Sequence, residues 1–233
     1  MRTFPSLALG LILGLLSGCT GVGSKVITLD EGSPRVRAVQ VENPRGNVTV
    51  VRRAGVGPAR VEATLRVDRL QGRARQAELA QALSVTAEMN GGTLVVRADE
   101  PADGARVDLR VVVASGSGFF VRSAGGEVAL RGIEGRTEVD ADGSVEVVYD
   151  SPLTETVTIR TRVGPVVLVL PARSAGAFAL TSEKGRSTFT ARSGSVTESH
   201  LHQANDWTGV LNAGGNLVVV STDEGDIRVV VER

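Results

Sequence analysis

The chain has 233 residues, 42% of them hydrophobic, which is enough to bury the core of one large domain or two small ones. Its 26 basic residues balance its 26 acidic residues, so no electrostatic basis for binding nucleic acid exists and no such partner is expected. The single cysteine excludes an internal disulfide.

Residues 1–18 predict an export signal. An apolar stretch, Leu7–Leu16, follows the basic start and precedes the small residues Ser17 and Gly18. This stretch has about ten residues, whereas a helix needs about 20 to cross a bilayer. It therefore predicts a leader that is removed on export, and not a permanent membrane span.

The residues up to Cys19 resemble the bacterial lipobox, in which a peptidase cuts before a cysteine whose thiol carries diacylglycerol. The resemblance implies a mature chain that begins at Cys19 and is held at the membrane by its acyl chains. An ordinary signal peptide cut near a cysteine is the alternative. Thr20 stands where an Asp would resemble an inner-membrane retention signal, so an outer-membrane location is expected, on the periplasmic or the surface face. Residues 19–34 are expected to form a lipidated, flexible tether.

Residues 35–233 predict a single all-β domain with one short helix near its beginning. Alternating apolar residues flank a turn at 43–47 and recur at 60–67, as in half-buried strands. Good helix formers without β-branched residues predict a helix over 72–83. A hairpin should follow, in which 85–89 pairs with 93–98.

A short repeat dominates the second half of the chain: a turn ends in glycine, and alternating apolar residues follow. The first four glycines are spaced by 17, 21 and 21 residues. Such units are too small to bury their own apolar faces, so they predict a β-solenoid or β-roll of stacked rungs, of right or left hand. A two-sheet sandwich is the competing architecture. The repeat glycines are Gly126, Gly143, Gly164, Gly185 and Gly225, and Gly215 begins an additional copy.

The apolar residues of this repeat are expected to form the core. They are Val128, Leu130, Ile133, Val139, Val145, Val147, Val157, Ile159, Val166, Leu168, Phe178, Leu180, Phe189, Val196, Leu217, Val219, Ile227 and Val229.

The repeats, the polar turns before their glycines, and the early order of strand, helix and hairpin resemble the bacterial putative-adhesin β-solenoid family. That family is a domain of unknown function, often found on envelope proteins. The likeness covers residues 36–232 and is clearest in the closing turn, 221–227. It implies a fold and a place in the cell envelope, and it implies no reaction.

Two groups of residues are candidates for metal sites. His200 and His202 share one face of a strand, with Asp206 as the nearest carboxylate, but nothing completes the set and solvated histidines are preferred. Asp223, Glu224 and Asp226 could attract calcium, but acidic residues are common in β-turns, so a solvated turn is favoured. No metal and no cofactor is expected.

Catalytic groups are sparse. Ser195 sits in a predicted turn without a nucleophile-elbow motif, and Asp140, Asp142 and Asp150 are the carboxylates that a glycosidase on a solenoid face could use. Trp207 is expected to plug the open end or side of the rungs, and stacking on a sugar is its alternative.

The sequence therefore predicts a lipid-anchored envelope protein, attached through Cys19, that binds an unknown protein or glycan over an extended surface without catalysis. An envelope enzyme acting on polysaccharide and an envelope-stress or signalling accessory are the alternatives.

Overall fold

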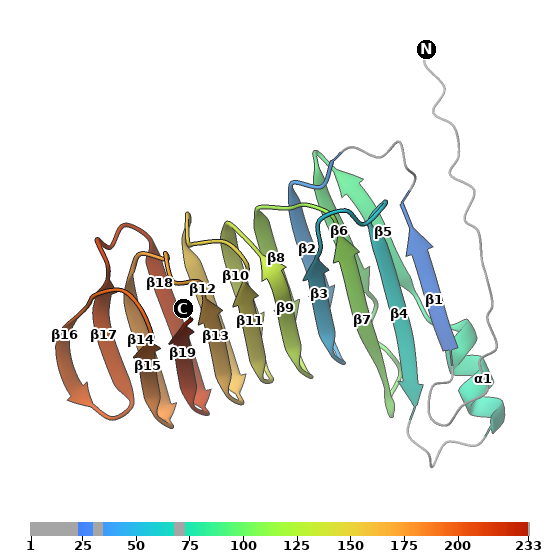
Figure 1. Cartoon of the computed structure of the whole chain (residues 1–233). Coiled ribbons are helices and arrows are strands. Elements are labelled where there is room, and N and C mark those ends of the chain that lie inside the picture. Colours follow the sequence, from blue (N-terminus) through green and yellow to red (C-terminus); the bar gives the residue numbers. More distant parts are fainter. Residues whose placement is uncertain (1–22, 30–34, 68–72, 233) are drawn as a thin grey trace.

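A computed structural model of the chain describes residues 23–29, 35–67 and 73–232. It is an all-β body of two large sheets, with one helix, α1 (Arg73–Gln81), at one end (Figure 1). The predicted all-β class and short helix are confirmed. The predicted hairpin is also confirmed, because residues 85–90 pair antiparallel with residues 93–98. Gly91 and Gly92 between them both have positive φ angles, as a two-residue turn of this kind requires.

The strands form a nine-stranded sheet A and a ten-stranded sheet B. Sheet A has the order β1 (Gly23–Thr28), β4 (Arg60–Val67), β7 (Ala105–Val113), β3 (Val48–Arg52), β9 (Val128–Ile133), β11 (Val145–Tyr149), β13 (Val166–Leu170), β19 (Ile227–Val231) and β15 (Ser187–Ala191). Sheet B has the order β16 (Val196–Gln203), β17 (Asp206–Leu211), β14 (Gly176–Lys184), β18 (Leu217–Glu224), β12 (Val157–Val163), β10 (Arg136–Ala141), β8 (Gly118–Ser123), β2 (Ala38–Asn43), β6 (Thr93–Ala98) and β5 (Val85–Asn90).

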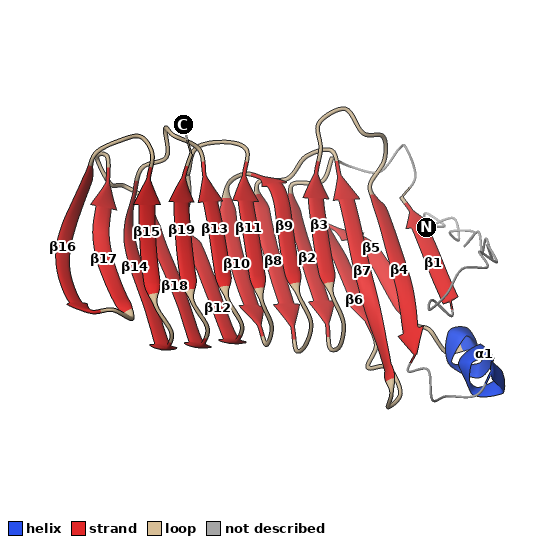
Figure 2. Cartoon of the chain, turned by 60° about the horizontal axis from the view of Figure 1, so that its bottom comes forward, coloured by secondary structure: helices blue, strands red, loops and turns tan. Residues whose placement is uncertain are grey.

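Neighbouring strands are parallel in the middle of both sheets (Figure 2). They are antiparallel at both ends of sheet B and at the β1 end of sheet A, whereas β15 pairs parallel with β19 at the other end of sheet A. From β6 to β15 the chain passes alternately from a strand of sheet B to a strand of sheet A, as it also does from β2 to β3 and from β18 to β19, so each such pair makes one rung. A closed β-solenoid is not confirmed, because the two sheets stay open and antiparallel strands such as β1 and β16 form their edges. Two stacked sheets are also what the competing sandwich architecture would provide.

The rungs do not stack in the order of the sequence. The β2–β3 rung lies between β6–β7 and β8–β9, and the last rung, β18–β19, lies between β12–β13 and β14–β15. Both early and late segments of the chain are therefore inserted between other rungs, where their backbone groups are paired on both sides.

β1 lies within the stretch expected to be a tether. Its six residues pair antiparallel with β4, from Gly23 beside Leu65 to Thr28 beside Arg60. Residues 23–28 therefore belong to sheet A, and the folded body begins earlier than residue 35.

Stacked glycines mark the turns from sheet B to sheet A. A Cβ atom on Gly143 would lie 1.9 Å from the carbonyl oxygen of Gly126, and one on Gly225 would lie 2.2 Å from that of Gly164. Only glycine permits such close approach between neighbouring turns. In spatial order this glycine ladder consists of Gly46, Gly126, Gly143, Gly164, Gly225 and Gly185.

The five repeat glycines of the sequence thus occupy equivalent turns. The prediction of an additional copy of the repeat at Gly215 is wrong. This glycine precedes β18 in sheet B, and a Cβ atom there would meet nothing within 4 Å.

Buried polar side chains run beside the glycine ladder. Thr161 donates a hydrogen bond to the carbonyl oxygen of Gly143 at 2.5 Å, and Ser182 donates one to that of Gly225 at 2.7 Å. Each hydroxyl satisfies a carbonyl of a neighbouring turn, which offsets the cost of burying both groups. Asn43, Ser123, Thr161, Thr222 and Ser182 make up this row.

The core lies between the sheets and consists mainly of valine and leucine. Most predicted core residues are buried, and Phe189 and Val196 pack against the core while partly exposed. The prediction that Leu217 belongs to the core is wrong, because its side chain is 51% exposed. Val219 is only partly buried, whereas Val218 and Val220 are fully buried. Four consecutive apolar residues contain no alternation, so the sequence could not show which two point inward.

Candidate functional site

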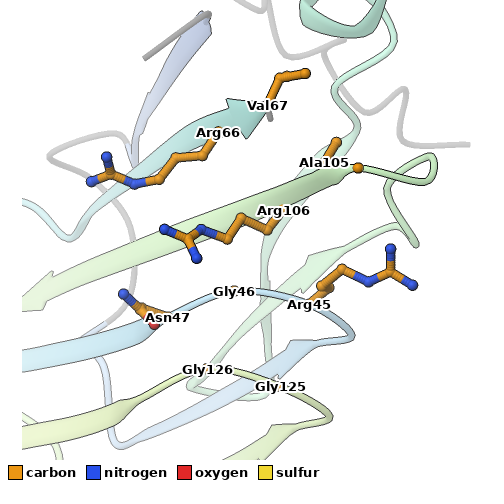
Figure 3. Close-up of a pocket in the computed structure, with 10 residues that line it drawn as sticks. Arg45, Gly46, Asn47, Arg66, Val67, Ala105, Arg106, Gly125 and Gly126 are labelled. Atoms are coloured by element: carbon orange, nitrogen blue, oxygen red, sulfur yellow. The ribbon is translucent and has the colours of Figure 1, made fainter. Parts of the chain in front are cut away.

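A hollow of about 600 Å³ opens where β4 ends and β7 and β3 begin (Figure 3). Its lining combines arginine side chains with the turn that carries Gly46 and the turn that carries Gly126. The lining residues are Arg45, Gly46, Asn47, Arg66, Val67, Gly104, Ala105, Arg106, Gly125 and Gly126. Sequence reasoning did not single out this site.

Arg66 and Arg106 lie directly opposite each other on the antiparallel strands β4 and β7. Both are exposed, and Figure 3 shows their guanidinium groups on the same side of the hollow. Like charges at directly opposed positions of a sheet destabilise it. The pair therefore concentrates positive charge at a place where stability alone would not favour it.

Asp108 partly balances this charge. One of its carboxylate oxygens accepts a hydrogen bond from Nε of Arg66, and the other accepts one from the backbone N–H of Asn47 at 3.0 Å. The guanidinium of Arg106 has no hydrogen bond or ion pair within the part of the chain that the structure describes.

Asn47 adds a third donor. Its Oδ1 accepts a hydrogen bond from the backbone N–H of Glu127 at 2.9 Å, and this contact orients the amide. In Figure 3 the amide nitrogen of Asn47 points to the side where the guanidinium groups of Arg66 and Arg106 lie. The three side chains therefore present N–H donors on one side of the hollow.

Arg45 does not join this group. Its guanidinium points to the opposite side of the hollow in Figure 3 and is paired with Glu100 at 3.2 Å and Asp103 at 3.8 Å. These pairs are exposed, so they position the side chain without adding much stability.

A smaller hollow of about 200 Å³ lies on the outer face of sheet B, around Phe120. Hydrogen bonds from Arg97 and from Gln40 hold the pKa of the Glu42 carboxyl below its ordinary value, so Glu42 stays charged there. The guanidinium of Arg136 lies 5.5 Å from the centre of the Phe120 ring. An aromatic ring among carboxylates and amides suits a polar ligand with apolar faces.

Two of the three candidate glycosidase carboxylates, Asp140 and Asp142, line one hollow of about 500 Å³. Asp140 lies exposed on β10, and Asp142 pairs with Arg162 at 3.0 Å near the Gly143 turn. Asp150 lies at the other end of β11, whose five residues span about 16 Å. The described structure therefore separates Asp150 from the other two carboxylates, and Asp142 is already engaged by Arg162.

The acidic closing turn is engaged within the fold. Asp226 accepts a hydrogen bond from the backbone N–H of Arg186 at 2.9 Å, and Glu224 pairs with Lys184 at 2.5 Å. The hydrogen bond from Lys184 lowers the pKa of the Glu224 carboxyl. Among the side chains that the structure describes, no group of three acidic, histidine or cysteine residues is placed to hold a metal ion.

The other candidates have different outcomes. Ser195 is an exposed turn residue whose backbone N–H donates to Asn212. The side chains of His200 and His202 lie outside the described residues, as does Cys19. No helix among the described residues has the length and apolar character to cross a membrane.

Trp207 closes the end of the core. It is 3% exposed, and its ring stacks on Phe189 with centroids 4.3 Å apart. Phe178 packs edge-on against Phe189 at 5.0 Å. The expected role of Trp207 as a cap is thus confirmed, and the sugar-stacking alternative is wrong because the ring is not accessible.

The fold is similar to that of solved bacterial structures. A putative cell adhesion protein from Clostridium sporogenes matches 90% of this chain and 99% of its own, with 10% identity and a TM-score of 0.52. A putative adhesin from Bacteroides fragilis matches 88% of this chain and 97% of its own, with 12% identity and a TM-score of 0.35. No family model and no curated protein matches the sequence. At these identities the first likeness supports the fold alone, and the second adds nothing to it.

Proposed function

We propose that the protein is an exported lipoprotein of the bacterial outer membrane, tethered by lipid on Cys19, whose body is an adhesin-like binding scaffold. The motif that ends at Cys19 supports the tether. The body would act by display and contact, and its partner would be a protein or a glycan.

We also propose that the central rungs constitute a flattened β-solenoid. The alternation of the chain between sheets A and B and the glycine ladder support this description. A stack of this kind is stabilised by neighbouring rungs, and it gives long outer faces on which side chains form rows.

One observation carries the scaffold proposal: polar and charged side chains are spread along the outer faces and do not converge in an enclosed cleft. The hollow at Arg66 and Arg106 is open, and Asp142 and Asp150 lie at opposite ends of β11. Catalysis requires groups fixed within hydrogen-bond reach of one reacting atom, whereas a binding face requires only exposure and rigidity.

The test uses the chain from Thr20 to Arg233, which contains every described element, and labelled polysaccharide extracted from the envelope of its host. The immobilised protein is expected to retain polysaccharide or a solubilised envelope protein, while the length of the polysaccharide stays constant on incubation. Shortening of the polysaccharide, measured by gel filtration, would favour the enzyme alternative and overturn the scaffold.

A further inference from the structure

The arginine pair lies at the end of the body to which the chain from Cys19 leads. Gly23, the first residue of β1, pairs with Leu65, which directly precedes Arg66 on β4. Cys19 is only four residues before Gly23, a span of at most about 14 Å. Figure 2 shows β1, β4 and β7 side by side at one end of the sheets.

Nothing within the described protein uses the full charge of this pair. Asp108 engages Nε of Arg66, which leaves the terminal nitrogens of that guanidinium available, and Arg106 has no partner among the described residues. The Nδ2 group of Asn47 points to the same side (Figure 3). Guanidinium groups donate paired N–H bonds in a geometry that matches phosphate oxygens.

We propose that Arg66 and Arg106, with Asn47, bind the phosphate of a lipid headgroup in the membrane that holds Cys19. This inference rests on the proposed lipid anchor, because the anchor brings the hollow within reach of the headgroup layer. The contact would fix the end with β1 and α1 against the membrane and direct the far end, capped by Trp207, away from it.

The open shape of the hollow favours a headgroup over a free anion. A small soluble anion needs a site that surrounds it, whereas a headgroup is already concentrated at the membrane surface and has to be contacted from one side only. Each arginine near an anionic membrane surface strengthens binding about fivefold.

The test measures sedimentation of the non-lipidated chain from Thr20 to Arg233 with vesicles of phosphatidylcholine and phosphatidylglycerol. Arg106→Gln is expected to weaken binding about fivefold. Asp108→Asn is expected to strengthen it by a similar factor, because it removes the competing carboxylate while its amide oxygen can still accept from Asn47. Higher salt should weaken all binding.

Arg110→Gln is the matched control. Arg110 lies on the same strand and the same outer face as Arg106, is also exposed, and stands opposite Glu62 outside the hollow. The substitution removes the same charge as Arg106→Gln but from outside the hollow, so vesicle binding near that of the unchanged protein is expected. Circular dichroism and thermal unfolding verify that each variant is folded.

Three results would overturn the proposal. Equal losses for Arg106→Gln and Arg110→Gln would indicate attraction by general charge. Competition by soluble glycerophosphate at a concentration equal to that of the vesicle headgroups would identify a free phosphate as the ligand. Absence of vesicle binding would exclude the headgroup site. The lipid anchor is tested separately, by the mass of the mature chain, so failure of either proposal can be told from failure of the other.

Discussion

Gly225→Ala is expected to lower the free energy of unfolding by about 3 to 5 kcal/mol. The added Cβ atom would lie 2.2 Å from the carbonyl oxygen of Gly164 and 2.5 Å from its carbon, and Gly225 has a φ of +146°. Both contacts are with backbone atoms, which cannot rotate away as a side chain can. The β18–β19 rung would have to move away from β12–β13, at the cost of hydrogen bonds in both sheets. Urea unfolding followed by circular dichroism measures the loss.

Gly215→Ala separates the effect of the contact from that of backbone strain. Gly215 has a φ of +113°, but no heavy atom lies within 4 Å of the added Cβ atom. The expected loss is only the cost of an alanine in this backbone region, about 1 kcal/mol. Equal losses for the two variants would show that the glycine ladder is not what holds neighbouring turns together.

Trp207→Ala is expected to cost about 3 to 5 kcal/mol, as for other large aromatic side chains removed from a core. Its ring is parallel to that of Phe189 within 3° and lies 6.4 Å from Phe178. Without it, the apolar end of the core between β15 and β17 would meet water. Circular dichroism must follow this unfolding, because the variant has no tryptophan left to report by fluorescence.

Leu217→Ala is the control for this cap. Leu217 is also a large apolar residue of the C-terminal half, but it is 51% exposed, so a change within about 0.5 kcal/mol is expected. If Trp207→Ala unfolded at the same urea concentration as Leu217→Ala, the aromatic cluster would have no part in closing the core.

Local features of the fold could be predicted from the sequence because they depend on neighbours along the chain. The helix at 73–81 and the Gly91–Gly92 hairpin follow from residue preference and turn geometry. The repeat glycines could be found because the same close approach to a neighbouring turn recurs at each of them, at similar intervals along the chain.

The order of the rungs could not be predicted in the same way. Val229 and Leu168, for example, occupy paired positions on neighbouring strands, but similar apolar residues at equivalent positions would fit between other rungs as well. In the sequence the repeat at Gly225 follows the repeat at Gly185. In the structure its turn lies between the turns of Gly164 and Gly185. Only long-range pairing decides this order.

The candidate site depends on the same long-range pairing. Arg66 and Arg106 are 40 residues apart in the sequence, and each reads as an ordinary outward residue of an alternating strand. Their meeting is fixed by the register of β4 and β7. The site could have been found from the sequence only if the register of these two strands had been known, and the alternation of apolar residues does not give that register.

The most direct test of the proposed function is the intact mass of the protein extracted from the membranes of its host, beside that of Cys19→Ser. The account predicts a mature chain that begins at Cys19 and is heavier by its acyl groups, and a Cys19→Ser variant that carries no lipid. An unmodified chain cut at another position would contradict the tether and, with it, the place that the proposed scaffold takes at the membrane.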